Sequence, residues 1–243
     1  MTQPTACVLI IGNEILSGKT QDTNLQFLGS ELAKLGIRLA EGRVVRDEPD
    51  AIIRHVNECR AAFTYVFTTG GIGPTHDDIT TECIARAFGV PVVLNDTIVE
   101  IMKRSGRPLN EARLKMARIP QGAQIVENTV SLPGFRIENV FVFAGIPSIA
   151  RAMFVGAAPM LLQGTPILSA SVDAYLREGD FAEALEQIQQ KHPDVEIGSY
   201  PFNRDGTLGA TLVARGTNRT LLGSVISEIV AAITALGGET KLN

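Results

Sequence analysis

The chain has 243 residues, a hydrophobic content of 45% and a formal net charge of -4 at pH 7. This length allows one large domain or two unequal ones, and the hydrophobic content is typical of globular proteins and excludes a disordered or fibrous chain. With three tyrosines, no tryptophan and no basic cluster, the chain lacks the stacking aromatics and the basic footprint of a nucleic-acid-binding protein.

The first apolar run, residues 7–11, is too short for a signal peptide or a membrane span and follows no basic segment. We therefore expect a cytoplasmic protein that binds neither membranes nor nucleic acids. The cysteines Cys7, Cys59 and Cys83 are widely spaced among apolar or helical residues, so buried reduced thiols are expected.

Apolar runs of strand length alternate with helical patterns over the first 160 residues or so. Strands are predicted at residues 5–11, 37–45, 65–69 and 90–94, and helices at residues 23–35, 50–61 and 78–88. This alternation predicts a three-layer α/β/α fold with a mostly parallel, doubly wound sheet. A broken helix is predicted next at residues 96–116, then short strands within 120–143 and a helix at 149–162.

A linker is predicted at residues 163–166, which divides the chain into domains 1–163 and 166–243. The second domain carries a βαββα pattern, with strands at 167–175, 195–201 and 208–214 and helices at 180–191 and 218–236. The pattern predicts a small α+β domain. Domains of this kind often form dimer interfaces, so we expect a homo-oligomer.

Two glycine-rich loops follow predicted strands, and neither matches a common nucleotide motif. Five residues separate Gly12 from Gly18, whereas a P-loop requires four. In the loop that starts at Gly70, His76 occupies the place of the third glycine of a dinucleotide-binding fingerprint. Both of these nucleotide-binding motifs are therefore excluded.

The second loop nevertheless has the composition of an anion site. Three glycines remove side chains where a strand turns into a helix, so backbone amides can approach a phosphate: Gly70, Gly71 and Gly73. Three threonines add hydroxyl donors: Thr69, Thr75 and Thr80. The loop therefore predicts binding of a small phosphate-containing ligand.

Asp77 and Asp78 stand where the helix after this loop is predicted to begin. One interpretation is that Asp78 only caps the helix, a role that stabilises a helix by about 0.5–2 kcal/mol. The other is that both carboxylates hold a divalent cation (Mg²⁺, Mn²⁺ or Co²⁺). Without a cation between them, two carboxylates beside a phosphate site would repel the ligand. Glu14 in the first loop is a further candidate, either as a catalytic carboxylate or as a contact to a ligand hydroxyl.

Three segments carry a resemblance to a known family: residues 12–18 (GNEILSG), 22–24 (DTN) and 69–80 (TGGIGPTHDDIT). They resemble the molybdopterin-binding family of molybdenum cofactor biosynthesis, the MoaB/Mog-like proteins. The nearest branch is the amino-terminal domain of CinA (competence/damage-inducible protein A), which also resembles a domain of some eukaryotic FAD synthases. The resemblance covers roughly residues 5–162.

The resemblance implies that a pterin or nucleotide phosphate binds the loop from Gly70 to Asp78. It adds Asp47 as a second motif aspartate and candidate metal ligand. It extends the phosphate-binding set to motif positions elsewhere in the chain: Gly12, Asn24, Arg113, Gly145 and Pro147. For Arg113 two interpretations stay open, a bidentate phosphate contact and an ordinary exposed helix arginine. His76 departs from the branch, which often has lysine at this position.

The CinA branch implies a metal-dependent pyrophosphatase that acts on ADP-ribose or FAD-like dinucleotides, with Asp77, Asp78 and Glu14 as catalytic residues. The cofactor-biosynthesis branch implies a molybdopterin-binding or adenylating protein. A third hypothesis is a non-catalytic binding module, in which the loop persists for structure and the small domain binds a protein partner. The carboxy-terminal amidohydrolase domain of full-length CinA proteins is not expected in a chain of this length.

Overall fold

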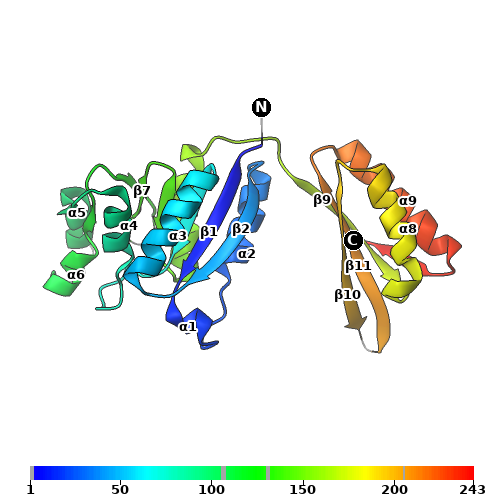
Figure 1. Ribbon diagram of the computed structural model, residues 1–243, viewed down its shortest axis with the longest axis horizontal. Helices are drawn as coiled ribbons and strands as arrows, with labels where there is room; N and C mark the ends of the chain where they lie inside the picture. Colours follow the sequence, from blue (N-terminus) through cyan, green and yellow to red (C-terminus); the bar gives the residue numbers. More distant parts are fainter. Residues whose placement is uncertain (1–2, 105–107, 130–131, 205) are drawn as a thin grey trace. The chain divides into compact units, whose positions relative to one another are not determined.

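The computed structural model describes residues 3–104, 108–129, 132–204 and 206–243 (Figure 1). The chain forms two compact units, Met1–Gly164 and Thr165–Asn243, and each is described here by itself. No helix in the described part of the chain is long and apolar enough to cross a membrane.

The large unit is built on a six-stranded mixed sheet. Its order is β2 (Arg38–Val45), β1 (Thr5–Ile11), β3 (Tyr65–Thr69), β8 (Val140–Phe143), β7 (Gly134–Ile137) and β6 (Gln124–Val126). The first four strands are parallel, and β7 and β6 continue the sheet antiparallel. The expected α/β fold with a mostly parallel sheet is therefore confirmed.

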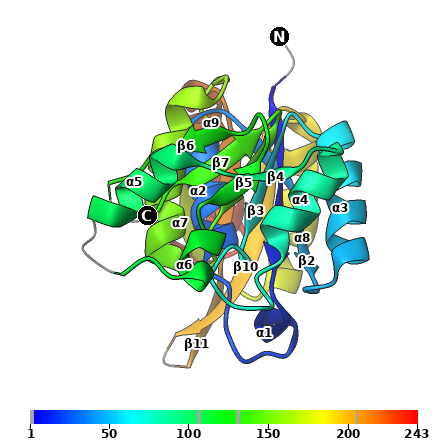
Figure 2. The same cartoon turned by 90° about the vertical axis from the view of Figure 1, so that its left-hand side faces the viewer.

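Helices cover both faces of this sheet (Figure 2). The unit contains α1 (Asn13–Leu16), α2 (Asn24–Lys34), α3 (Pro49–Ala62), α4 (Thr80–Phe88), α5 (Asp96–Arg104), α6 (Glu111–Lys115), α7 (Pro147–Ala157) and the short 3-10 helix η1 (Ala158–Met160). One core lies between the sheet and α3, α4 and α5, and a second lies between the sheet and α2 and α7. Each face therefore has its own hydrophobic layer.

The central strands are buried along their whole length because both of their faces are covered, and they are mostly apolar, with Thr68 and Thr69 as buried polar residues at the end of β3. Every residue of β3 and β8 is buried, whereas the edge strand β2 alternates between exposed and partly buried positions. The ring of Phe67 lies 5.2 Å from that of Phe141 and 6.0 Å from that of Phe154, measured between centroids. These rings fix the packing of β3, β8 and α7.

Several elements differ from the sequence predictions. The strand expected at residues 90–94 is β4 (Val92–Leu94), which pairs with β5 (Arg118–Pro120) in a separate two-stranded sheet instead of joining the central one. The helix expected from residue 78 begins at Thr80. The break predicted near residues 106–108 falls mostly on 105–107, which lie outside the described residues.

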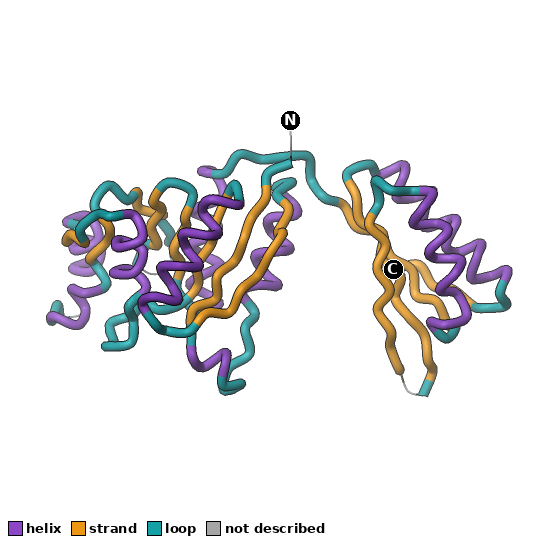
Figure 3. The backbone as a smooth tube through the Cα atoms, in the orientation of Figure 1, coloured by secondary structure: helices purple, strands orange, loops and turns teal. Residues whose placement is uncertain are grey.

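The small unit is a four-stranded antiparallel sheet with two helices on one face (Figure 3). The sheet order is β10 (Glu196–Arg204), β11 (Thr207–Gly216), β9 (Leu168–Tyr175) and β12 (Glu239–Leu242), and the helices are α8 (Glu178–Lys191) and α9 (Arg219–Ala235). The predicted α+β domain is confirmed, but its last strand, β12, was missed. That strand is short and largely polar, so its sequence carries no strand pattern.

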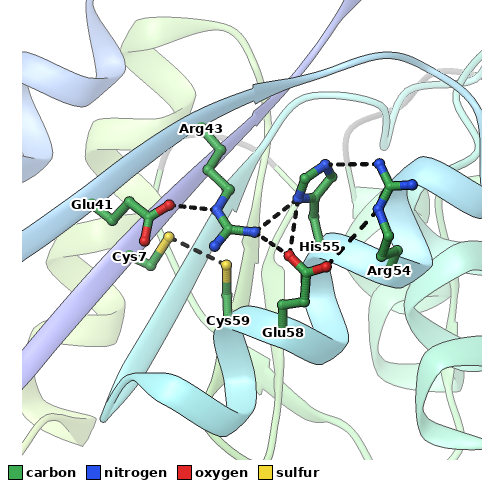
Figure 4. Close-up of polar contacts among 7 residues, drawn as sticks. All are labelled: Cys7, Glu41, Arg43, Arg54, His55, Glu58 and Cys59. Atoms are coloured by element: carbon green, nitrogen blue, oxygen red, sulfur yellow. Dashed lines mark hydrogen bonds and ion pairs between the residues drawn. The ribbon is translucent and has the colours of Figure 1, made fainter.

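The cysteines are free and buried, as predicted. Figure 4 shows Cys7 on β1 facing Cys59 on α3, with their sulfur atoms 3.5 Å apart. Beside them, Arg43 contacts Glu41 at 2.6 Å and Glu58 at 2.5 Å and ties β2 to α3. Burial raises the pKa of the third thiol, Cys83, to about 11.

Candidate functional site

The carboxyl ends of the parallel strands β1, β3 and β8 meet at one edge of the central sheet. The Gly70 amide donates to the Phe143 carbonyl (3.1 Å), which joins the loop after β3 to the end of β8. Gly70 has a φ of 103°, and a β-carbon there would lie 2.1 Å from the Ile11 carbonyl oxygen. A β-carbon on Gly145 would lie 3.3 Å from the Gly70 Cα. Only glycine allows so close a junction of three strand ends, where ligands bind in folds of this class.

The glycine loop, residues 70–79, is held by Thr80. The buried Thr80 hydroxyl donates to the Gly70 carbonyl (3.0 Å), and its amide donates to the Gly71 carbonyl (2.9 Å). A β-carbon on Gly71 would lie 2.1 Å from the Thr80 hydroxyl oxygen, so this residue must be glycine as well. The Thr80 hydroxyl proton, predicted to contact a phosphate, is committed to holding the loop.

Asp77 and Asp78 both face Thr75. The Thr75 amide donates to the Asp78 carboxylate (2.8 Å), and the Thr75 hydroxyl contacts both carboxylates. This hydroxyl is the main reason that the pKa of Asp77 lies below its ordinary range. A β-carbon on Gly73 would lie 2.6 Å from a carboxylate oxygen of Asp78, which makes room for this turn.

The proposal that Asp78 caps the helix is wrong. Ile79 occupies the N-cap position of α4 without a side-chain hydrogen bond, and the Asp78 carboxylate instead closes the turn back to Thr75. The helix therefore starts two residues after Asp78, at Thr80, whose amide and hydroxyl both bond to the glycine loop.

Lys115, at the end of α6, reaches the same loop and was missed by the sequence analysis. Its ammonium group donates to the Thr75 carbonyl (2.7 Å) and contributes to the low pKa of Asp77. The sequence offered no signal, because 40 residues separate Lys115 from Thr75 and only the packing of α6 brings them together. It is a cation beside the aspartate pair.

The other motif residues hold the framework together. The Asp47 carboxylate accepts from the Asn13 amide (2.7 Å) at the start of α1. Asn110 caps α6, where Arg113 donates to the Pro108 carbonyl (2.8 Å). Pro147 begins α7 at the first helical turn. Among the described residues, no three side chains of His, Cys, Asp or Glu converge as a metal site would require.

Two neighbouring pockets open at this edge of the sheet and share Gly145 in their walls. The larger, here the apolar pocket, has a volume of about 220 Å³. Its walls are mainly apolar: Ile72, Gly73, Pro74, Thr81, Met116, Arg118, Ile119, Leu132, Pro133, Phe135, Ala144, Gly145, Ile146, Ile149 and Met153. No local sequence pattern indicates this pocket, because its residues come from five separate segments.

The smaller pocket, here the polar pocket, has a volume of about 60 Å³. Its walls come from the ends of β1 and β3, from α1, from the loop before α2 with the first residue of α2, and from the segment that leads into α7: Ile10, Ile11, Glu14, Ile15, Thr20, Gln21, Asp22, Thr23, Asn24, Thr69, Gly145 and Pro147. A β-carbon on Gly12 would lie 2.6 Å from the Glu14 carboxylate oxygens, so glycine there lets Glu14 fold back over the loop. Glu14 and the aspartate pair thus belong to different parts of the site, since neither Asp77 nor Asp78 lines either pocket.

Comparison with known proteins assigns both units. The family model described as "Probable molybdopterin binding domain" matches residues 7–163, and the model described as "FAD synthase, middle domain" matches residues 166–237. A protein from Archaeoglobus fulgidus is 33% identical over 80% of this chain and 84% of its own length.

Named relatives point to the same two groups. A CinA-like protein of Gloeobacter violaceus is 31% identical, covering 97% of this chain and 58% of that protein. A probable FAD synthase of Caenorhabditis elegans is 33% identical, covering 81% of this chain and 44% of that protein. The chain therefore spans about half the length of these two relatives.

A solved structure agrees with this assignment. The crystal structure of CinA from Thermoplasma acidophilum, titled as a protein of unknown function, superposes with a TM-score of 0.60 at 32% identity. The match covers 65% of this chain and 97% of that one. The chain thus belongs to the molybdopterin-binding domain family, and it is similar to the CinA proteins within it.

Proposed function

We propose that this protein binds a dinucleotide such as ADP-ribose or FAD and hydrolyses its pyrophosphate bond with the help of a divalent metal ion. The observation that carries the proposal is the pair of pockets, one apolar and one polar, that share Gly145 beside the glycine loop. A ligand with a flat ring, a sugar and a phosphate presents these chemistries in adjacent positions. The matches to a molybdopterin-binding domain and to the middle domain of FAD synthase support a ligand of this class.

The apolar pocket supplies the site for the ring. Its volume of about 220 Å³ and its lining by Ile72, Met116 and Phe135 suit a planar heterocycle that gains from leaving water. The phosphates would then lie against the loop from Gly70 to Gly73, where missing side chains let the backbone approach. Lys115 offsets the charge of the aspartates as the anion arrives.

Asp77 and Asp78 fit the donor set of a magnesium-type ion, because such ions take one or two carboxylates and complete their shell with water and ligand phosphates. Both carboxylates face Thr75, and the pKa of Asp77 lies below its ordinary range, so this residue is ionised at neutral pH. When bound, the metal supplies charge neutralisation and a more acidic water. Thr75 contacts both carboxylates, and Glu14, which lines the polar pocket, would contact a hydroxyl of the ligand.

The direct test is to incubate the purified chain with ADP-ribose or FAD and with Mg²⁺, Mn²⁺ or Co²⁺, and to separate the products by chromatography. We expect AMP with ribose 5-phosphate from ADP-ribose, and AMP with FMN from FAD. The double variant Asp77→Asn, Asp78→Asn should lose turnover, whereas the matched control Glu183→Gln, on an exposed face of α8, should keep it. No turnover by the unaltered chain under any of these conditions would refute the hydrolase proposal.

A second candidate function is favoured by the family match over residues 7–163. In this case the protein binds molybdopterin, as a carrier or an adenylating enzyme, and the pterin occupies the apolar pocket. Tight binding of a pterin in equilibrium dialysis, without hydrolysis of dinucleotides, would select it. Adenylation would show as pyrophosphate release when the pterin and ATP are added together.

We also propose that the protein is a homo-oligomer. Light scattering of the full chain tests this directly, and a monomeric mass at working concentration would contradict it.

A further inference from the structure

Two residues in the wall of the polar pocket each carry a buried oxygen atom that lacks a partner among the described residues. These atoms are the Asn24 side-chain oxygen and the Thr69 hydroxyl. Asn24 is only 3% exposed and Thr69 only 1%. Buried polar atoms are almost always hydrogen-bonded in native proteins, so two such atoms in one pocket indicate a missing partner.

Asn24 is locked in one orientation. Its amide nitrogen donates to the Gly145 carbonyl (2.8 Å), and a carbonyl can only accept, so the nitrogen must face Gly145. The side-chain oxygen is thereby fixed as an acceptor. An occupant must offer this oxygen a hydrogen-bond donor, which an ionised phosphate does not have.

The charged groups of the pocket also disfavour a phosphate. Glu14 and Asp22 are its ionisable side chains, and both accept hydrogen bonds and carry negative charge when ionised. Asp22 already accepts from the Leu25 amide (2.8 Å) with one oxygen. No lysine or arginine among the described residues lines the pocket. The pocket therefore disfavours an anion, and the phosphate contact predicted for Asn24 does not follow from its surroundings.

Size narrows the chemistry further. A cavity of about 60 Å³ has room for roughly four or more water-sized groups at about 10–15 Å³ each, which suits a cluster of hydroxyls better than a fused ring. The apolar pocket is several times larger and takes the ring. Because Gly145 lines both pockets, one ligand can reach into each.

We infer that the polar pocket binds the vicinal hydroxyls of a ribose, with Asn24 accepting and Thr69 accepting or donating. The inference rests on the proposed function and gives it a specificity: the ligand is a ribonucleotide, and its sugar is recognised by residues that do not touch the phosphates.

The test compares ADP with 2′,3′-dideoxy-ADP by isothermal titration calorimetry in Mg²⁺ buffer, using the full chain and checking that both ligands stay intact. The variant is Thr69→Val, which keeps the β-branched shape and removes the hydroxyl. Its control is Thr68→Val, which removes a hydroxyl that is equally buried and unpartnered in the described structure but lies outside both pockets.

The unaltered chain should bind ADP about 10-fold or more tightly than dideoxy-ADP. Thr69→Val should weaken ADP binding about 3–10-fold and narrow that preference, while Thr68→Val leaves both unchanged. Neither substitution should lower the melting temperature, because each removes a buried hydroxyl without a protein partner. A merely structural hydroxyl would behave in the opposite way, with a lower melting temperature and unchanged binding.

Two outcomes would overturn the inference, and they are distinguishable. If ADP binds but dideoxy-ADP binds equally well, or if Thr69→Val binds ADP like the unaltered chain, the ribose assignment is wrong and the nucleotide site stands. If the unaltered chain binds neither ADP nor ADP-ribose, the proposed function fails and the ribose assignment fails with it.

Discussion

Replacing Gly70 by alanine should destabilise the large unit more than replacing any other glycine of the glycine loop by alanine. The new methyl group would clash with the backbone of the neighbouring strand β1. The new β-carbon would lie 2.1 Å from the Ile11 carbonyl oxygen, and the residue would keep a φ of 103°. A non-glycine residue in such a conformation costs about 1–3 kcal/mol. Forcing the two strand ends apart adds about 1–3 kcal/mol.

The expected loss in the free energy of unfolding is therefore about 2–6 kcal/mol, which corresponds to a fall of roughly 4–24 °C in the melting temperature of a unit of this size. Urea unfolding followed by far-ultraviolet circular dichroism measures it, since the chain has no tryptophan to report by fluorescence. The variant Gly237→Ala identifies which unfolding transition belongs to the small unit. Its β-carbon would meet nothing within 4 Å, so it should shift the transition of the small unit alone.

The matched control is Gly89→Ala, at the end of α4. Gly89 also has a positive φ, of 67°, but a β-carbon there would meet nothing within 4 Å. Its cost should be the conformational term alone, about 1–2 kcal/mol. If Gly70→Ala destabilised the protein no more than Gly89→Ala, the close junction of β1 and β3 would not constrain this position, and the reasoning would be refuted.

Three further predictions concern titratable groups. Hydrogen bonds, first from Thr211 and then from Arg204, hold the pKa of Asp173 at about 2, below its unfolded value of 3.8; the stability this provides is complete above about pH 4 and is lost as the pH falls toward 2. The urea midpoint of the small unit should therefore fall across that window, and Asp173→Asn should give a lower but flatter curve, whereas parallel curves would argue against it. Removing the Thr75 hydroxyl by Thr75→Val should raise the pKa of Asp77 toward its ordinary value, as measured by carboxyl NMR titration, and an unchanged pKa would show that Thr75 is not the cause. All three thiols should resist Ellman's reagent at pH 8 in the native protein and react fully in denaturant, because their side chains are buried; rapid reaction of one thiol under native conditions would contradict that burial.

The ribose assignment, if confirmed, would divide recognition between two parts of the chain that do different work. The loop from Gly70 to Asp78 would bind the phosphates, and the segment from Thr20 to Asn24 would contact the uncharged hydroxyls of the sugar. Such a division gives specificity for the sugar, because a ligand without hydroxyl groups there leaves the Asn24 side-chain oxygen without a hydrogen-bond donor. The phosphate contacts are unaffected.

Much of the fold followed from local pattern. The runs that became β1, β3 and β8 are mostly apolar, because a central strand of a parallel sheet is covered on both faces. The helical spacing of Leu28 and Leu32 predicted α2 within one residue at each end. These features depend on which face of a helix or strand is buried, and the spacing of apolar residues along the sequence indicates that face.

The sequence alone determined the two-layered helix covering of an α/β sheet, the smaller α+β unit and the glycine loop with its two aspartates. Tertiary structure decided what those pieces form. It placed β4 outside the central sheet, moved the start of α4 from Asp78 to Thr80, and brought Lys115 to Thr75. It also turned Asn24 toward Gly145, across 121 residues of chain. The physical reason is that a site is made by side chains meeting across strand ends, and their meeting depends on the order of strands in the sheet, which no local period records.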